Sequence, residues 1–127
     1  MTTEVRDDRK RILMVDDDPD STLVMKRLLS GLGYDVQTAD SVRGALRACE
    51  DESFDVLISD IGLPDGNGCD LMRQLIAQGA SGLKGIALSG FAMEDDVRQS
   101  LAAGFQRHVC KPINIQRLQS LIEEVIA

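Results

Sequence analysis

Aromatic residues, histidine and cysteine are scarce in this chain. Only 3% of its 127 residues are aromatic and none is Trp, so its core must be aliphatic. The three cysteines, Cys49, Cys69 and Cys110, are far apart, form no CxxC pair and are accompanied by a single His. This scarcity disfavours a zinc site or a disulfide framework, and we expect buried, reduced thiols instead.

Basic residues and long apolar runs are also few. The formal net charge of -7 and the isoelectric point near 4.6 disfavour a nucleic-acid-binding surface, which normally has a basic face. The acidic balance fits either a cation-binding site or a solvated acidic surface. No apolar run approaches the roughly 20 residues of a membrane span, and the charged start MTTEVRDDRKR does not resemble a signal peptide. We therefore expect a cytoplasmic protein without a nucleic-acid partner or membrane insertion.

The chain divides into a short tail and one domain. Residues 1–10 are polar, which predicts a flexible N-terminal tail. Residues 11–127 are numerous enough for one globular domain that buries its own core. No linker or low-complexity segment interrupts this stretch.

Short apolar runs alternate with amphipathic segments along the domain. Strands are predicted at 11–15, 34–38, 55–59, 85–89 and 107–110. A helix is predicted after each strand, and the first helix carries apolar residues at helical spacing: Leu23, Val24, Leu28, Leu29 and Leu32. This alternation indicates a parallel sheet covered on both faces, and right-handed crossovers make it a doubly wound α/β domain.

Local signals mark the ends of several helices. Asp18-Pro19 is typical of an N-cap followed by Pro at the first helical position. Ser41 and Asn114 are the predicted N-caps of the second and last helices, and Gly33 is a natural stop for the first. The fourth helix is expected to carry Leu101 on its apolar side.

Polar side chains gather at the predicted strand ends. In a doubly wound sheet, ligands bind beyond the carboxyl ends of the strands, where the strand order reverses. The run ILMVDDDPD takes the first strand into Asp16-Asp17, the third strand ends in Asp60 and the fourth in Ser89. The fifth strand runs into Lys111. We therefore expect three carboxylates, a hydroxyl and an ammonium at one edge of the sheet.

These groups have a defined chemical capacity. Adjacent carboxylates raise the cost of ionising one another unless a cation lies between them, and oxygen ligands from Asp16, Asp17 and Asp60 suit Mg²⁺. Asp60 is a candidate metal ligand or a nucleophile that accepts a phosphoryl group, with Ser89 and Lys111 to neutralise and hold its oxygens. The plainer alternatives are a solvated loop for Asp16-Asp17 and a turn or cap for Asp60.

Four motifs follow one another at these strand ends: VDDD at 15–18, LISDIGLPDGNG at 57–68, ALSG at 87–90 and KP at 111–112. In this combination the chain resembles the receiver domain of two-component response regulators, the CheY-like superfamily, from about residue 11 to its end. The resemblance implies a flavodoxin-like (βα)5 three-layer sandwich with a five-stranded parallel sheet in the order 2-1-3-4-5. The phrases LSGFA and AGFQRHVCKP resemble receivers attached to or serving hybrid sensor kinases.

The resemblance implies a phosphoacceptor and a metal site. Asp60 would accept the phosphoryl group. Asp16, Asp17, Asp60 and the backbone carbonyl of Gly62 would bind Mg²⁺. Gly62 and Phe91 would occupy the positions that tune the lifetime of the phosphoryl group.

The resemblance also implies a switch. Ser89 would hydrogen-bond the phosphoryl group and Lys111 would pair with it, after a cis peptide bond between Lys111 and Pro112. His108 falls where the family often has an aromatic residue that turns inward on phosphorylation. The alternative for His108 is a half-exposed strand histidine, and a further hypothesis is that its titration makes the switch pH-sensitive.

As a member of this family, the protein would be a signalling switch and not a metabolic enzyme. A histidine kinase or a histidine phosphotransfer protein would donate the phosphoryl group, and slow hydrolysis would return Asp60. The change would spread to the face of the fourth helix, fifth strand and fifth helix, which is also a possible homodimer surface. The resemblance fits a stand-alone regulator and the terminal receiver of a hybrid kinase equally well.

A phosphatase like the haloacid dehalogenases is one rival interpretation. In it, Asp16 is the nucleophile and Asp18 completes a DxD motif, with Ser89 and Lys111 as later motifs. Asp20 stands where that class has Thr or Val. Only one helix is predicted after Lys111, which leaves no place for the late acidic metal-binding motif.

A calcium loop and a degenerate receiver are the other rivals. The spacing Asp16-x-Asp18-x-Asp20 starts a calcium loop, but its sixth position is Ser21 and its twelfth is Arg27, where Gly and Glu are required. A degenerate receiver that only binds a partner is disfavoured because every expected site residue is present.

Overall fold

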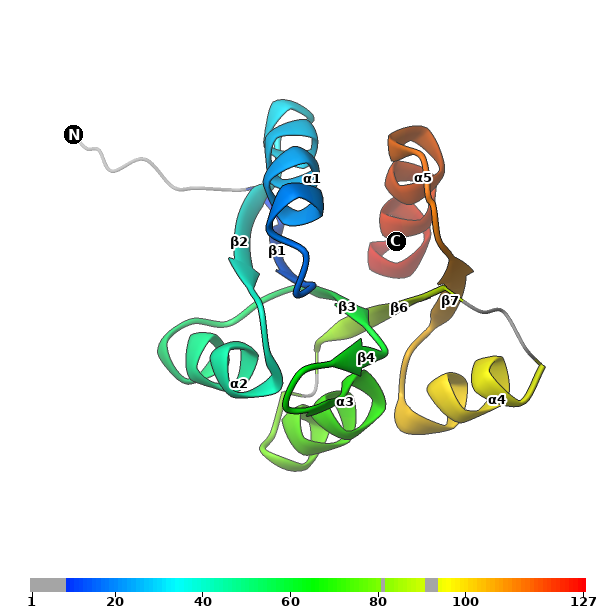
Figure 1. Ribbon diagram of the computed structural model, residues 1–127. Coiled ribbons are helices and arrows are strands. Elements are labelled where there is room, and N and C mark those ends of the chain that lie inside the picture. The colour runs from blue at the N-terminus through cyan, green and yellow to red at the C-terminus, as the bar shows by residue number, and fades with distance from the viewer. Residues whose placement is uncertain (1–8, 81, 91–93) are drawn as a thin grey trace.

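Five parallel strands form the centre of the computed structural model, which describes residues 9–80, 82–90 and 94–127. They are β1 (Arg11–Val15), β2 (Asp35–Ala39), β3 (Val56–Asp60), β6 (Lys84–Ser89) and β7 (Arg107–Cys110). Their order in the sheet is β2-β1-β3-β6-β7 (Figure 1). Since β6 and β7 are the fourth and fifth strands of this sheet, the predicted order 2-1-3-4-5 is confirmed.

Helices cover both faces of the sheet. On one face lie α1 (Pro19–Gly31) and α5 (Ile115–Ile126) (Figure 1). On the other lie α2 (Val42–Asp51), α3 (Gly68–Ala77) and α4 (Glu94–Ala103). The three-layer doubly wound sandwich predicted from the sequence is therefore the observed architecture.

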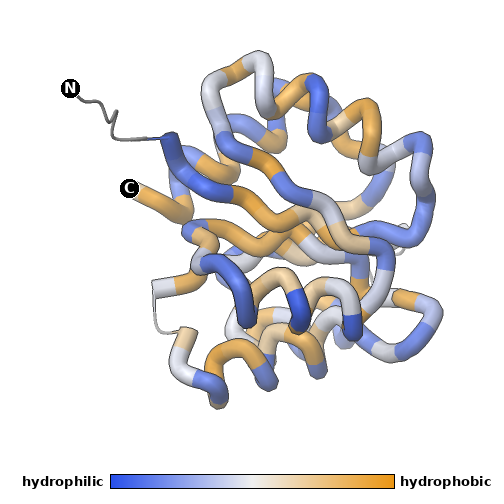
Figure 2. Tube along the Cα trace, turned by 90° about the vertical axis from the view of Figure 1, so that its left-hand side faces the viewer, coloured by the Kyte–Doolittle hydropathy of each residue, from blue (hydrophilic) through white to orange (hydrophobic). Residues whose placement is uncertain are grey.

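The apolar runs of the strands are buried from both sides. Alternate residues of a strand point to opposite faces: Leu13 and Leu57 belong to the cluster under α2 and α3, whereas Ile12 and Ile58 belong to the cluster under α1 and α5. Figure 2 shows these apolar strand segments running through the middle of the molecule, between the helices. Burial on both faces explains why the strands are continuously apolar and do not alternate.

The predicted caps are present at three helices. The side chain of Asp18 accepts a hydrogen bond from the backbone N–H of Asp20, and Pro19 is the first residue of α1. Ser41 accepts from Gly44 N–H at α2, and Asn114 accepts from Arg117 N–H at α5. The first helix ends at Gly31, and Gly33 follows in the left-handed region with φ of 101°, a conformation that favours glycine.

The apolar faces of two helices differ from the prediction. Of the five apolar residues expected to bury α1, only Leu29 is buried, and Leu23, Val24, Leu28 and Leu32 are exposed. On the face of the sheet that α1 shares with α5 (Figure 1), α1 buries only Thr22 and Leu29, and α5 supplies more of the buried apolar residues: Leu118, Leu121, Ile122 and Val125. In α4, Leu101 is exposed and Ser100 is buried in its place.

The segments outside the sandwich are short. Two-residue strands β4 (Gly62–Leu63) and β5 (Gly66–Asn67) form an antiparallel hairpin inside the predicted turn after β3. Of the predicted N-terminal tail, residues 1–8 lie outside the described residues, and residues 9 and 10 are exposed. Across the described residues, none of the helices has the length and apolar character that a membrane crossing requires.

Candidate functional site

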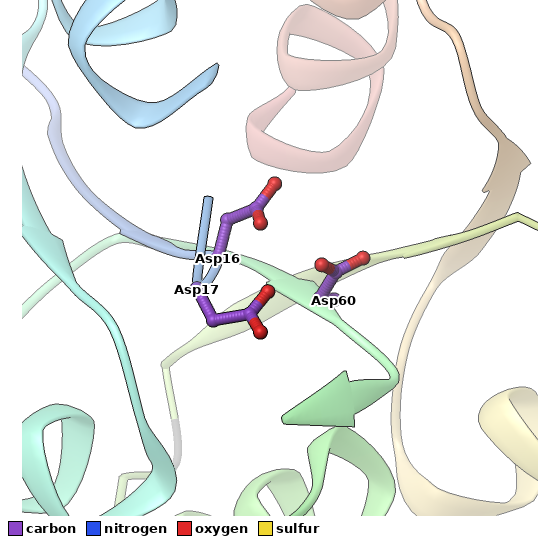
Figure 3. A group of neighbouring side chains, drawn as sticks. All are labelled: Asp16, Asp17 and Asp60. Carbon is purple, nitrogen blue, oxygen red and sulfur yellow. The ribbon is translucent and has the colours of Figure 1, made fainter. Parts of the chain in front are cut away.

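Three carboxylates meet at the carboxyl edge of the sheet. Asp16 directly follows β1 and Asp60 is the last residue of β3; both are buried, whereas Asp17 is exposed. Because β1 and β3 are hydrogen-bonded neighbours, their ends lie side by side. One carboxylate oxygen from each of the three residues lies within 4.8 Å of the others (Figure 3). The expected cluster is therefore present.

Lys111 brings a positive charge to this cluster. It directly follows β7, which is an edge strand of the sheet. Its Nζ donates to Asp60 Oδ2 at 2.8 Å and to Asp16 Oδ2 at 3.1 Å. Its backbone N–H donates to the Ser89 carbonyl at 2.7 Å, which ties the segment after β7 to the end of β6. The peptide bond between Lys111 and Pro112 is cis.

Burial and charge shift the protonation of this group of residues. Burial raises the pKa of Asp60 to about 6; the Lys111 hydrogen bond opposes this rise and the charge of Asp16 adds to it. For Lys111, burial favours the neutral amine, but the hydrogen bonds to Asp60 and Asp16 outweigh it and raise the pKa. The ammonium thus stays charged and offsets only part of the acidic charge.

The donor set fits a magnesium ion. Asp16, Asp17 and Asp60 offer oxygen atoms only, and Mg²⁺ prefers oxygen ligands and takes few protein carboxylates. The three carboxylates carry more negative charge than the single ammonium of Lys111 neutralises. This excess charge favours binding of a divalent cation. Gly62 stands two residues after Asp60 at the start of β4, and its carbonyl remains a predicted ligand.

Asp18 belongs to the helix and not to the cluster. Its Oδ1 accepts from Asp20 N–H at 3.1 Å and its Oδ2 accepts from Ser21 Oγ at 2.9 Å. The Ser21 hydrogen bond and the Asp20 backbone bond lower the pKa of Asp18. Both oxygens therefore stabilise the start of α1, which disfavours a DxD nucleophile motif.

Two predicted switch residues touch each other. Ser89 Oγ lies 2.9 Å from His108 Nε2 across the β6–β7 pair. His108 is a half-buried residue of β7, as expected for a half-exposed strand histidine, and its role as a switch residue stays a prediction. The other predicted tuning residue, Phe91, lies outside the described residues.

Two residues near the site were missed from the sequence. Gly68 begins α3, and a Cβ there would lie 2.3 Å from the backbone oxygen of Asp60. Its N–H donates to the Ile61 carbonyl at 2.7 Å, so the helix is held directly against the strand end. Ser100, fully buried in α4, lies 2.8 Å from His108 Nδ1. Gly68 appeared only as a turn residue, and no sequence signal distinguished Ser100.

A family model described as the response regulator receiver domain matches residues 12–123 of this chain. The chain belongs to that receiver family. The matched range contains every candidate site residue, and the receiver domain assigns the chain to two-component signalling. Membership of the receiver family excludes assignment of this chain to the haloacid dehalogenase-like phosphatases or to the calcium-loop proteins.

Relatives of this receiver domain occur alone and inside large proteins. The "Uncharacterized 14.6 kDa protein in sodA1 3'region" of Leptolyngbya boryana is 32% identical over 115 residues, 89% of this chain and 87% of that protein. Virulence sensor protein BvgS of Bordetella bronchiseptica is 33% identical over 123 residues, 92% of this chain and only 10% of BvgS. The predicted likeness to receivers of sensor kinases is therefore found.

A solved structure shows the same architecture. The crystal structure of a CheY-like response regulator receiver domain protein from Methanospirillum hungatei JF-1 has a TM-score of 0.87 and 34% identity. It covers 93% of this chain, and this chain covers 94% of it. The CheY-like fold predicted from the motifs is confirmed.

Proposed function

We propose that this receiver domain accepts a phosphoryl group on Asp60 in the presence of Mg²⁺ and acts as a phosphorylation-dependent switch. The observation that carries the proposal is the position of Asp60: its buried carboxylate lies within 4.8 Å of Asp16 and Asp17 oxygens and 2.8 Å from Lys111 Nζ. A nucleophile, a cation site and an ammonium are the groups that phosphoryl transfer to a carboxylate needs.

The transfer step makes one bond and breaks one. A carboxylate oxygen of Asp60 forms a bond to the phosphorus of the donor, and the bond from phosphorus to the donor's imidazole nitrogen breaks, with its electron pair staying on that nitrogen. Lys111 keeps its charge and is placed to pair with the new phosphoryl oxygens. Mg²⁺, when bound by Asp16, Asp17 and Asp60, supplies charge that offsets the oxygens in the transition state.

The proposed donors are a histidine kinase or a histidine phosphotransfer protein. A donor must reach the carboxyl edge of the sheet, and α1 begins at that edge directly after the acidic residues. Val24, Leu28 and the C-cap residue Leu32 are exposed and follow one another four residues apart, so they form one apolar ridge along α1 and its C-cap. An exposed apolar ridge beside a polar site fits the flank of a partner's helix bundle.

The remaining parts of the proposal concern what the domain does afterwards. Hydrolysis would return Asp60 to its carboxylate, so the protein is a switch with self-catalysed chemistry and not an enzyme acting on metabolites. The proposed output face consists of α4, β7 and α5, which is also the predicted surface for a homodimer. We propose a cytoplasmic location without a nucleic-acid partner, in line with the acidic net charge of -7.

Intact-mass measurement after incubation with acetyl phosphate and Mg²⁺ tests the proposal. We expect one phosphoryl adduct on the unmodified chain and none on Asp60→Asn or with a chelator. Asp51→Asn, a matched change of an exposed residue at the end of α2, should label normally. An adduct that persists in Asp60→Asn but disappears in Asp16→Asn would move the nucleophile to β1 and contradict the proposal. If acetyl phosphate gives no adduct, titration with beryllofluoride and Mg²⁺ separates a selective receiver from an inactive one.

A further inference from the structure

Three side chains link the edge of the sheet to α4. Ser89 Oγ lies 2.9 Å from Nε2 of His108, and Nδ1 of the same ring lies 2.8 Å from Ser100 Oγ. Ser100 Oγ in turn donates to the backbone carbonyl of Val97 at 2.8 Å. Ser100 is 0% exposed, so the α4 end of this chain of hydrogen bonds is closed to water.

Counting hydrogens gives the direction of these bonds. A serine hydroxyl has one hydrogen, and Ser100 uses it on the Val97 carbonyl. Ser100 Oγ must therefore accept from Nδ1–H of His108. In a neutral imidazole only one nitrogen carries a hydrogen, so Nε2 is an acceptor. Ser89 then donates its own single hydroxyl hydrogen to His108.

We propose that Ser100 is a positioning residue: it fixes the hydrogen of His108 on Nδ1 and thereby directs the Ser89 hydroxyl hydrogen to His108. The consequence rests on the proposed function, because a phosphoryl oxygen on Asp60 would compete for that same hydrogen. Ser89 cannot donate to both acceptors at once, so phosphorylation breaks the Ser89–His108 bond. The half-buried ring then lacks a donor at Nε2, and the change reaches α4 through Ser100.

The single histidine of the chain makes the tautomer directly measurable. Long-range ¹H–¹⁵N NMR at about pH 8, above the usual titration range of histidine, identifies the nitrogen that carries the hydrogen. We expect Nδ1–H in the resting protein and loss of that preference in Ser100→Ala. Ser120→Ala, the same change at an exposed position of α5, should keep Nδ1–H. An Nε2–H tautomer in the unmodified chain, or an unchanged tautomer in Ser100→Ala, would overturn the proposal.

Binding of beryllofluoride with Mg²⁺ tests the competition. In His108→Phe the acceptor on the ring is gone, and in Ser100→Ala Nε2 is no longer fixed as the acceptor of the Ser89 hydrogen. The variants differ from the unmodified chain by the cost of breaking one neutral hydrogen bond. We therefore expect both to bind beryllofluoride about 2- to 10-fold more tightly, and Ser120→Ala to bind it as the unmodified chain does. Equal or weaker binding in both variants would overturn the competition. If Ser100→Ala does not fold, as urea unfolding will show, His108→Phe and the tautomer of the unmodified chain still decide.

The two proposals fail in different ways. If beryllofluoride does not bind the unmodified chain, or binds Asp60→Asn equally well, the proposed function is wrong and the competition falls with it. If beryllofluoride binds in an Asp60-dependent way but the resting tautomer is Nε2–H, the proposed function stands and only the role of Ser100 is wrong.

Discussion

Asp60 is 8% exposed, and its burial raises the pKa of the carboxyl to about 6 from an ordinary value of 3.8. The folded chain therefore holds this proton more tightly than the unfolded chain does. By linkage, ionised Asp60 reduces the stability of the metal-free fold. This loss of stability is fully present above pH 6. It disappears as the pH falls from about 6 to the ordinary pKa of 3.8.

Replacement of this charge is expected to stabilise the metal-free protein. In urea unfolding with a chelator, Asp60→Asn should raise the free energy of unfolding by roughly 1–3 kcal/mol at pH 7. The gain should be much smaller near pH 4, because Asp60 is then almost fully protonated in the folded state and the pH is close to the ordinary pKa of 3.8. Asp51→Asn serves as the exposed control. A loss of stability at pH 7 would mean that the Lys111 ion pair outweighs the cost of burial.

A second prediction concerns Gly68. The backbone of Asp60 fills the space that a side chain at position 68 would occupy. Gly68→Ala should push α3 away from the end of β3, reduce the free energy of unfolding by about 1–3 kcal/mol and slow labelling by acetyl phosphate. Gly82→Ala is the matched control, since a Cβ there meets nothing within 4 Å. Normal stability and labelling of Gly68→Ala would show that the α3 junction is not a constraint.

The elements themselves differ in how far the sequence determines them. The strands were predictable because burial on both faces requires unbroken apolar runs such as that of β1. The caps at Asp18, Ser41 and Asn114 were predictable because they depend on neighbouring residues alone. The buried side of α1 was not predictable from its own sequence. It depends on α5, which contacts α1 from a distant part of the chain.

The exposed ridge of α1 carries a prediction about the partner. Leu28→Asp should reduce phosphoryl transfer from a histidine kinase or phosphotransfer protein at least about tenfold, since charge in an apolar contact is costly to desolvate. Labelling by acetyl phosphate should be unchanged, because the ridge takes no part in the chemistry. Leu101→Asp is the matched control on α4, with a similarly exposed leucine. Equal loss in both variants, or in labelling by acetyl phosphate, would contradict docking on α1.

At the scale of the whole molecule, the site exists only because the fold joins distant segments. Asp16 and Lys111 are 95 residues apart in sequence and 3.1 Å apart at their nearest charged atoms. Their meeting was predictable from the topology of a doubly wound sheet, which gathers all strand ends on one edge. The contacts of Ser100 and Gly68 were not predictable from the sequence, because they depend on how each helix is rotated and how closely it packs against the sheet.

Because the proposed metal ligands come from β1 and β3 together, Mg²⁺ is expected to stabilise the entire fold. At a Mg²⁺ concentration about 100 times the dissociation constant, the free energy of unfolding should rise by about 2.7 kcal/mol. Asp17→Asn should lose most of this gain, while Asp51→Asn should retain it. Calorimetry with and without a chelator measures the shift. An equal Mg²⁺ effect in both variants would place the ion elsewhere.

The cluster of three carboxylates, two of them paired with one ammonium, also links two ligands thermodynamically. Under the proposed function, the phosphoryl group adds negative charge beside the same oxygens that hold the cation. Whatever factor Mg²⁺ contributes to the affinity for a phosphoryl analogue, the analogue must contribute to the affinity for Mg²⁺. The phosphorylated domain would thus retain its metal at ion concentrations that leave the resting domain largely metal-free, and its signal would outlast a brief fall in Mg²⁺.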